Sequence, residues 1–405
     1  MTLVTARQPR VAVDATTAAR GGGLSYLARQ LPELERAGAK LLVFAQSSAR
    51  DELGPLLLAP DWIAVPSSRL RRIAFVHARL AAHARRWGAD VLYCPGSTSP
   101  IVGGIPSVMT IQNPHLFAAP APRTLRHALL RITAVLSALR ASHVVHISGT
   151  MAQEFERTAP VAVPSSVIYS GAGGLEPTSD VGDNSFETQP YILAVSNLYR
   201  YKRMDLIIRA YAGDDELRGH YQLLIAGGEI DEGLPQELRD LADRLGQGAR
   251  VRLLGSCSPS TLASLYRHAS VYVSASEREA FPLTPAEALV ARLPVVLSDI
   301  PVFRELYGEW ALFPNGWTPQ DFADAIKSAL ASGGQSEASA QVTDRFSWRR
   351  NGNELFKVLS SAKGRRVGLV AAAARVRPQR IPSFVRAVLG SRDLRSPAVL
   401  SDLVD

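Results

Sequence analysis

The sequence predicts an α/β protein made of two parallel-sheet domains. Short apolar runs alternate with helical patterns along most of the 405 residues, which is typical of parallel strands connected by helices. This alternation stops once, over residues 173–190, where Gly, Pro, Ser, Thr and Asp dominate, and it restarts at Tyr191. A chain of this length is also expected to form two or three domains.

We expect five segments in order along the chain. They are a first domain over 1–172, a linker over 173–190, a second domain over 191–345, a closing helix over 346–360 and a basic tail over 361–405. The tail holds nine basic and three acidic residues, a net charge of +6, with apolar patches between them. Such a segment can bind an anionic membrane surface, and a disordered tail is the alternative that this composition leaves open.

Each domain is expected to contain its own series of strands and helices. In the first half, we expect strands at 11–14, 40–44, 62–66, 90–94, 107–111, 143–148 and 165–169, and helices at 24–36, 69–87, 122–141 and from about 150. In the second half, we expect strands at 191–195, 221–228, 250–255 and 271–276, and helices at 206–211, 261–268, 286–292, 301–306 and 319–330.

The composition excludes several classes of protein. Hydrophobic residues make up 46% and charged residues 20%, as in soluble globular proteins. The net charge of +8 favours an anionic partner, and the low aromatic content of 7% weighs against nucleic acid. Cys94 and Cys257 stand far apart, so neither a disulfide framework nor a zinc site is expected. Neither a signal peptide nor a transmembrane helix is evident, so we expect a cytoplasmic protein.

The segment from Glu279 to Glu287 predicts a site for phosphate and hydroxyl groups. It places two carboxylates eight positions apart on a loop between an apolar strand and a helix. Pro285 suits the first turn of that helix, and Glu287 is expected in the same turn, where the helix dipole favours a carboxylate. Free N–H groups around Leu283 and Thr284 would then bind an anion. A sugar nucleotide has this chemistry, with phosphate in the middle and hydroxyls at both ends.

This segment, EAFPLTPAE, resembles the E-x7-E motif of retaining, nucleotide-sugar-dependent glycosyltransferases of family 4. The resemblance extends from about Val11 to Leu359 and is stronger in the second half. It implies the GT-B fold, in which two Rossmann-like parallel-sheet domains face a central cleft. In that fold, the first domain would bind the acceptor and the second the nucleotide sugar. It also implies that Glu279 orients the donor sugar as a catalytic residue and that Glu287 binds the ribose.

A basic loop follows the strand at 191–195. The stretch SNLYRYKRMD resembles the family's G-R-x(n)-K-G pattern, and Lys202 matches the lysine that binds the donor diphosphate. Asn197 replaces the family's arginine, so Asn197 and Arg203 are further candidate donor contacts. Cations on this loop would neutralise a diphosphate leaving group.

Two other loops carry candidate donor contacts. Ser256 follows the strand at 250–255, where the family's loop lies against the nucleotide base. Gly22 and Gly23 belong to the stretch GGGLSYLARQL, which looks like the family's loop facing the donor phosphate, with a flexible turn as the alternative. Because Tyr26 stands where a third glycine would be needed, a GxGxxG dinucleotide fingerprint is disfavoured.

His115 is a candidate catalytic residue in the first half. In the family a histidine often follows the strand that corresponds to 107–111, close to the donor sugar. Here Gln112 stands at that position and His115 lies three residues later. A structural or solvated histidine is the alternative reading, and Asn113 is another candidate contact.

The sequence therefore predicts a glycosyltransferase that needs neither cofactor nor metal and uses a nucleotide-diphosphate sugar as co-substrate. The expected acceptor is a glycan or a lipid-linked sugar of cell-envelope polysaccharide or glycolipid synthesis, reached in the cytoplasm or at the inner face of the membrane. The alternatives are a non-catalytic GT-B protein that binds a nucleotide or glycan, a sugar-nucleotide epimerase and a nicotinamide oxidoreductase. The missing GxGxxG weighs against the last of these.

Overall fold

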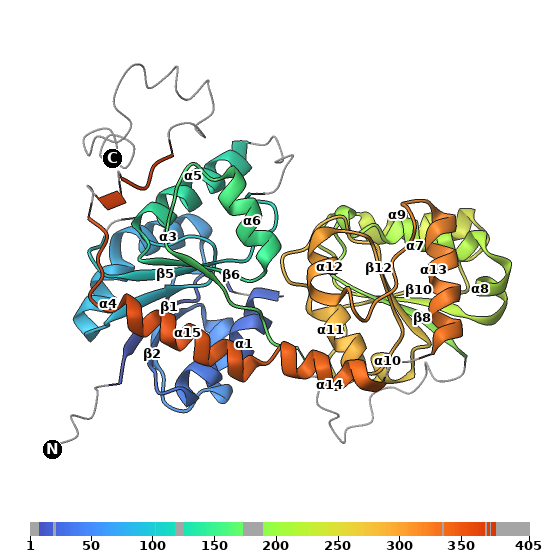
Figure 1. The fold of residues 1–405 in the computed structure, drawn as a ribbon, viewed down its shortest axis with the longest axis horizontal. Helices are drawn as coiled ribbons and strands as arrows, with labels where there is room; N and C mark the ends of the chain where they lie inside the picture. The colour runs from blue at the N-terminus through green and yellow to red at the C-terminus, as the bar shows by residue number, and fades with distance from the viewer. Residues whose placement is uncertain are drawn as a thin grey trace. The chain divides into compact units, whose positions relative to one another are not determined.

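The computed structural model describes residues 8–18, 22–101, 103–117, 125–172, 189–333, 336–368, 371–372 and 374–377. The chain forms two compact units (Figure 1). Unit 1 comprises Met1–Ser170 and Trp348–Asp405, and unit 2 comprises Gly171–Ser347. Most of the predicted linker, 173–188, and the end of the tail, 378–405, lie outside the described residues.

Unit 1 contains a parallel seven-stranded sheet with the order β3-β2-β1-β4-β5-β6-β7. Its strands are β1 (Arg10–Asp14), β2 (Lys40–Ala45), β3 (Asp61–Ala64), β4 (Val91–Cys94), β5 (Ser107–Ile111), β6 (His143–His146) and β7 (Ser165–Val167). The central strands are buried along their whole length, as expected for a sheet that is covered on both faces.

Helices cover both faces of this sheet. They are α1 (Gly22–Arg36), α2 (Ser47–Leu53), α3 (Arg69–Phe75), α4 (Ala81–Trp87), α5 (Leu125–Arg140), α6 (Gly149–Thr158) and α15 (Trp348–Ala362). Figure 1 shows α1 and α15 on one side of the sheet and α5 and α6 on the other. The predicted helix over 69–87 is interrupted, because a π-helical turn over Val76–Leu80 separates α3 from α4.

The late helix α15 belongs to unit 1 and packs closely on α1. A Cβ atom at Gly352 would lie 2.4 Å from the Cβ of Glu33, so only glycine allows the two helices to approach this closely. Asn351 accepts a hydrogen bond from Gln30 Nε2 at 2.9 Å and donates one to the carbonyl of Tyr169 at 2.7 Å. Tyr93, on β4, donates to Gln30 Oε1 at 2.7 Å. A buried polar network therefore connects α15 to the core of unit 1.

The first part of the predicted basic tail also packs on unit 1. Arg375 Nη1 donates to the carbonyls of Leu139 and Ala141 at 3.2 and 2.6 Å, at the C-terminal end of α5. A guanidinium at this position complements the negative end of the helix dipole. Val376 forms an antiparallel bridge with Val161. The described part of the tail up to residue 377 is thus an ordered segment of this unit.

Unit 2 contains a parallel five-stranded sheet with the order β10-β9-β8-β11-β12. The strands are β8 (Tyr191–Val195), β9 (Gln222–Ala226), β10 (Val251–Gly255), β11 (Val271–Ser274) and β12 (Val295–Leu297). The helices are α7 (Met204–Gly213), α8 (Asp215–His220), α9 (Leu234–Arg244), α10 (Pro259–His268), α11 (Leu283–Val290), α12 (Pro301–Tyr307), α13 (Pro319–Ser332) and α14 (Ser336–Arg345).

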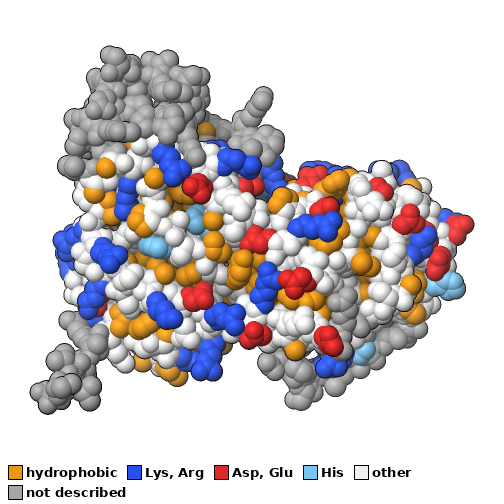
Figure 2. All heavy atoms as spheres, in the orientation of Figure 1, with side chains coloured by type: hydrophobic (Ala, Val, Ile, Leu, Met, Phe, Trp, Pro, Cys, Tyr) orange, Lys and Arg blue, Asp and Glu red, His pale blue; other side chains and the backbone are white. Residues whose placement is uncertain are grey.

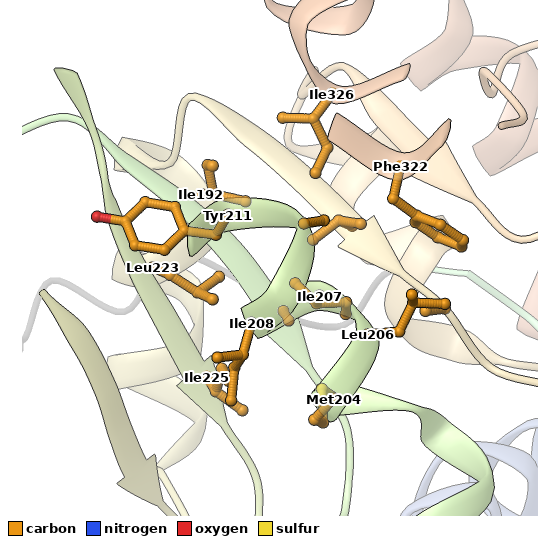
Figure 3. Close-up of a cluster of buried hydrophobic side chains, with 14 of the residues drawn as sticks. Ile192, Met204, Leu206, Ile207, Ile208, Tyr211, Leu223, Ile225, Phe322 and Ile326 are labelled. Atoms are coloured by element: carbon orange, nitrogen blue, oxygen red, sulfur yellow. The ribbon is translucent and has the colours of Figure 1, made fainter. Parts of the chain in front are cut away.

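The core of unit 2 lies between its sheet and helices α7, α9 and α13. Figure 3 shows Ile207, Ile208 and Tyr211 of α7 among strand residues and next to Phe322 and Ile326 of α13. These side chains are fully buried. Burying aliphatic and aromatic surface of this kind stabilises the fold by roughly 1.5–3 kcal/mol per side chain. This packed core therefore holds the carboxyl ends of the strands in fixed positions.

The two parallel sheets confirm the predicted α/β class. Among the described residues, no helix combines the length and the apolar character that crossing a membrane requires. On the face shown in Figure 2, basic side chains are spread over the surface with acidic ones among them.

Candidate active site

The carboxyl edge of the unit 2 sheet carries most of the predicted site residues. From β8 the chain continues outward to β9 and β10, and then returns to β11 and β12 on the other side of β8. The direction of winding thus reverses between β8 and β11. In open α/β sheets, ligands bind outside the carboxyl ends of the strands at such a switch point. Lys202 follows β8 and Glu279 follows β11, so these two residues flank this point.

Lys202 and Glu279 form a close ion pair. Lys202 Nζ lies 2.5 Å from Glu279 Oε1, and the two side chains are only 13% and 12% exposed. The ammonium also lies 5.3 Å from the ring centroid of Tyr201, at a cation–π distance. The structure therefore brings together the two residues that the sequence placed in one site. An ammonium has three donors, so Lys202 can hold Glu279 and an oxyanion at once.

Arg203, a candidate donor contact, binds two carboxylates of the protein in this structure. Its guanidinium pairs with Glu277 Oε1 at 2.9 Å and with Asp205 at 3.1 and 3.3 Å. Hydrogen bonds from the guanidinium to Asp205, and then to Glu277, raise the pKa of Arg203. These carboxylates already bind its guanidinium. A contact between Arg203 and the nucleotide-sugar donor therefore stays a prediction.

Helix α11 begins three residues earlier than expected, at Leu283 rather than Ala286. Proline is tolerated throughout the first turn of a helix, so Pro285 did not define where the helix begins. Glu287 consequently lies in the second turn, and the expectation of a carboxylate in the first turn was wrong. No side chain caps the N-terminus at Pro282, which leaves the N–H groups of Leu283 and Thr284 at an uncapped helix end.

Three buried tyrosines, which no pattern in the sequence singles out, hold this segment. The hydroxyl of Tyr266 donates to Glu287 Oε2 at 3.1 Å, that of Tyr272 donates to Thr284 Oγ1 at 2.8 Å, and that of Tyr307 donates to the carbonyl of Pro282 at 2.5 Å. All three are at most 1% exposed. In sequence they look like apolar strand and helix residues, and only their hydroxyl groups signal a polar role.

Two of these tyrosines lie close enough to both glutamates for the charges of Glu279 and Glu287 to affect their pKa. Burial is the main cause that raises the pKa of Tyr272, and the charges of Glu279 and Glu287 raise it further. Burial likewise raises the pKa of Tyr307, again with contributions from both glutamates. Both tyrosines are therefore neutral hydrogen-bond donors at physiological pH.

Asn197 and Ser256 meet around a glycine pair at the same sheet edge. A Cβ atom at Gly228 would lie 2.6 Å from Ser256 Oγ and 3.7 Å from Asn197 Oδ1. Gly227, at φ +151°, would place a Cβ 1.8 Å from the carbonyl oxygen of Ser196. The close approach that requires glycine here is therefore made by the protein's own backbone and the Ser256 side chain.

The candidates in unit 1 follow strands β1 and β5 of its sheet, in the first turn of α1 and in a turn after β5. Gly22 and Gly23 are the first residues of α1, and open space surrounds the position of a Cβ atom at each. His115 lies half-buried in the turn after β5, where its backbone N–H donates to Asn113 Oδ1 at 2.9 Å. The donor contacts of Gly22 and Gly23 and the catalytic role of His115 therefore stay predictions.

Asp14 is a further buried carboxylate, at the carboxyl edge of the unit 1 sheet, and it is not among the residues predicted above. It ends β1, is 7% exposed and accepts a hydrogen bond from the N–H of Thr16 at 3.1 Å. Burial raises its pKa, while hydrogen bonds from Thr16 and, to a smaller extent, the nearby His77 oppose this shift. The sequence does contain a signal for this residue, because Asp14 directly follows three apolar residues at the end of a strand. Among the described residues, no three His, Cys, Asp or Glu side chains cluster as metal ligands.

Comparison with known proteins identifies the family. Residues 20–172 match the model of "Glycosyltransferase Family 4", and residues 177–345 match that of "Glycosyl transferases group 1". A D-inositol 3-phosphate glycosyltransferase of Corynebacterium kroppenstedtii is 32% identical over 186 residues, which are 42% of this chain and 40% of the relative. The O-antigen chain mannosyltransferase RfbU of Salmonella typhimurium is 29% identical over 194 residues, or 48% of this chain and 52% of RfbU.

Solved structures of similar fold cover nearly the whole chain. Anabaena Alr3699/HepE, solved in complex with UDP and glucose, has a TM-score of 0.69 at 19% identity, covering 87% of this chain and all of that one. A glycosyltransferase from Rickettsia africae has the same TM-score at 15% identity and covers 88% of this chain and 99% of its own. The chain thus spans about half or less of the length of the curated relatives it matches. It spans nearly the whole length of these structural neighbours.

The two family models together match most of the chain, and the two parallel sheets have the architecture of these structural neighbours. This protein belongs to the family 4 glycosyltransferases with the GT-B fold.

Proposed function

We propose that this protein is a retaining, metal-independent glycosyltransferase. It transfers a sugar from a nucleotide-diphosphate donor to a glycan or lipid-linked acceptor. The observation that carries this proposal is the Lys202–Glu279 pair at the switch point of the unit 2 sheet. A cation and a carboxylate placed side by side suit a diphosphate joined to a polyhydroxylated sugar.

The residues of unit 2 take distinct roles in this proposal. Lys202 and the N–H groups of Leu283 and Thr284 bind the diphosphate, and Glu279 orients the sugar through its hydroxyls. Glu287, aligned by the hydroxyl of Tyr266, accepts hydrogen bonds from the ribose. Asn197 and Ser256 lie at the same edge and are suited to contacts with the rest of the nucleotide.

The chemistry requires that negative charge be stabilised as the sugar–phosphate bond breaks. Lys202 lies in a partly buried site, where its charge acts more strongly than it would in water. In the retaining scheme, an oxygen of the departing phosphate takes the proton of the acceptor hydroxyl while that hydroxyl attacks the anomeric carbon on the same face. A separate protein base and a metal ion are then not needed.

The test is turnover of nucleotide sugars with EDTA present. UDP-, GDP- and dTDP-sugars are first screened by thermal shift, because a bound ligand raises the apparent stability. Hydrolysis of the selected donor without acceptor, and transfer to inositol phosphate or lipid-linked glycan acceptors, are then measured by NMR, which also reports the anomeric configuration. Dependence on added metal, or inversion at the anomeric carbon, would contradict the scheme. Binding without hydrolysis or transfer would indicate a non-catalytic nucleotide-binding protein.

Glu279→Gln separates catalysis from folding. We expect turnover to fall by about 10²-fold or more, because one well-placed electrostatic contact contributes this much in comparable sites. Glutamine keeps the size of the side chain, and its amide oxygen can still accept a hydrogen bond from Lys202, so the melting temperature should change little. Glu309→Gln is the control, because Glu309 also pairs with a basic side chain, Arg345 at 3.1 Å, but is 71% exposed and lies in the turn after α12. Full activity of Glu279→Gln would remove this residue from the active site.

We also propose that unit 1 binds an anionic membrane surface, where a lipid-linked acceptor would be found. Unit 1 contains 30 Lys and Arg against 13 Asp and Glu, a net charge of +17, whereas unit 2 contains 15 against 24, a net charge of −9. On α3, Leu70 and Ile73 are 79% and 48% exposed, next to the exposed Arg69 and Arg71. Exposed apolar and basic side chains on one short helix suit anionic lipid.

Vesicle sedimentation tests this membrane contact. The whole chain should bind phosphatidylglycerol-containing vesicles, bind phosphatidylcholine vesicles weakly, and be released by high salt. Leu70→Ser with Arg71→Ser should weaken binding, while Ile230→Ser, at an exposed apolar site of unit 2, should not. Equal binding to both kinds of vesicle, or no binding, would contradict the proposal.

A further inference from the structure

Three contacts join the loop after β8 to the loop after β11 in unit 2. The N–H of Glu277 donates to the carbonyl of Tyr201 at 2.8 Å. Lys202 pairs with Glu279 at 2.5 Å, and Arg203 pairs with Glu277 at 2.9 Å. Three consecutive residues of the first loop thus bind two residues of the second, Glu277 and Glu279. Any shift between the two loops would change all three contacts.

Arg203 holds a backbone conformation that is unusual for its type. Its φ is +51°, in the left-handed region, where glycine is the favoured residue. It stands at the position after Lys202, where the family pattern has glycine. The left-handed turn lets Lys202 and Arg203 reach two different carboxylates, Glu279 and Glu277. An arginine here thus adds a contact that glycine could not provide.

We propose that the Arg203–Glu277 ion pair positions Lys202 for the donor diphosphate. This inference rests on the proposed function, in which Lys202 binds that diphosphate. Lysine has a flexible four-carbon side chain, so the place of its ammonium depends on where its backbone is held. The ion pair fixes the loop of Lys202 against the loop of Glu279 and so sets where the ammonium lies. Arg203 and Glu277 are positioning residues that act through Lys202.

A second ion pair on the same turn provides a matched comparison. Arg200 makes two hydrogen bonds to Glu237, at 2.7 and 2.6 Å, but Glu237 belongs to α9 and not to the loop after β11. The Arg200–Glu237 pair therefore has the same charges as the Arg203–Glu277 pair, but it does not connect this turn to the loop that carries Glu279. If any ion pair on this turn simply stabilised it, Arg200 and Arg203 would be equivalent.

The Arg203–Glu277 and Arg200–Glu237 pairs line the same cavity of unit 2, which has a volume of about 700 Å³. Arg203 and Glu277 are 32% and 46% exposed, and Arg200 and Glu237 are 60% and 53% exposed. Since water already reaches these groups, replacing Glu277 by glutamine leaves no buried charge without a partner. Substitutions at either pair should therefore be tolerated by the fold.

The test is a set of nucleoside diphosphate affinities measured by isothermal titration on the whole chain, with UDP, GDP, dTDP and ADP. Glu277→Gln and Arg203→Gly should each weaken binding by about fivefold, a typical coupling between contacting groups. Arg203→Gly suits the left-handed backbone and should keep its melting temperature, so its effect is not caused by unfolding. Arg200→Gln should bind as the wild type does.

Double variants show whether the pair acts through Lys202. In the Lys202→Ala background, Glu277→Gln should cause no further loss of affinity, because the group that it positions is already gone. An equal, additive loss in that background would overturn the proposal, as would an Arg200→Gln loss matching that of Glu277→Gln. If Lys202→Ala weakens binding while Glu277→Gln and Arg203→Gly do not, only the positioning role is wrong. If the wild type binds none of the four nucleotides, the proposed function itself fails, and the positioning role with it.

Discussion

The ammonium nitrogen of Lys202 lies 2.5 Å from a carboxylate oxygen of Glu279, although 77 positions separate the two residues in the chain. The two loops meet because β8 and β11 are neighbours in the sheet, with Leu193 of β8 opposite Tyr272 of β11. The candidate active site is therefore a consequence of strand order.

Replacing Lys202 by alanine should weaken nucleoside diphosphate binding by about 10- to 100-fold. A hydrogen bond to a charged group contributes about 1.5–3 kcal/mol, and 1.4 kcal/mol corresponds to tenfold in affinity. Titration calorimetry measures this change. Lys327→Ala is the control, since Lys327 also pairs with a carboxylate of unit 2, Asp214 at 2.8 Å, but lies on α13. Equal affinities for the wild type and Lys202→Ala would exclude Lys202 from the donor site.

Tyr272→Phe should loosen the start of α11 without breaking the core. It removes the hydroxyl that donates to Thr284, so the free energy of unfolding should fall by about 1 kcal/mol and the donor KM should rise. Tyr191→Phe is matched, because its buried hydroxyl also donates one hydrogen bond, to the carbonyl of Leu265 at 2.8 Å, which belongs to α10 and not to α11. Urea unfolding and donor kinetics together should show a similar stability loss in both variants and a raised KM only in Tyr272→Phe. A raised KM in both would mean that the tyrosine has no special link to the site.

Acid should destabilise unit 1 through His146. This side chain is 1% exposed, and its Nδ1 has no hydrogen-bond partner among the described residues. Burial, with a smaller contribution from His143, lowers the pKa of His146 from 6.5 to about 4. The unfolded chain therefore takes up a proton below pH 6.5 that the folded chain refuses, and stability falls as the pH drops from about 6.5 to about 4. The loss amounts to about 3 kcal/mol at most.

The variant His146→Leu isolates this effect from all other titrating groups. Its free energy of unfolding, measured by urea denaturation at several pH values, should depend less on pH between about 4 and 6.5 than that of the wild type. Above pH 7 the two slopes should agree, since His146 is neutral in both the folded and unfolded states. The same slopes throughout the acid range would mean that His146 titrates normally in the fold.

Asn351→Ala should destabilise unit 1 and leave the nucleotide site of unit 2 intact. The substitution leaves the buried amide of Gln30 and the carbonyl of Tyr169 each short of one partner, at a cost of about 1–3 kcal/mol per buried group. Urea unfolding followed by tryptophan fluorescence can report it through Trp348, on the same helix. Asn353→Ala, at an exposed position of α15, is the control. Loss of nucleotide affinity in Asn351→Ala would show that the units are coupled.

Much of the fold could be predicted because its signals are local. The apolar runs at 107–111 and 191–195 coincide with β5 and β8, since a strand buried on both faces must be apolar along its whole length. The prediction failed where local signals were ambiguous. Pro285 is compatible with several positions in a first turn, so α11 was placed three residues too late, and nothing in the helical pattern of 69–87 marks the π-helical turn.

The sequence by itself determined which residues carry charge at the ends of strands, among them Lys202 and Glu279. It could do so because an apolar strand followed by a polar loop is a pattern of neighbouring residues. Only the tertiary structure decided which charges meet: Lys202 with Glu279, Arg203 with Glu277, and the hydroxyl of Tyr266 with Glu287. Those pairings follow from the order of strands in the sheet and from the direction of each turn. Both are set by packing between distant segments, which no local pattern records.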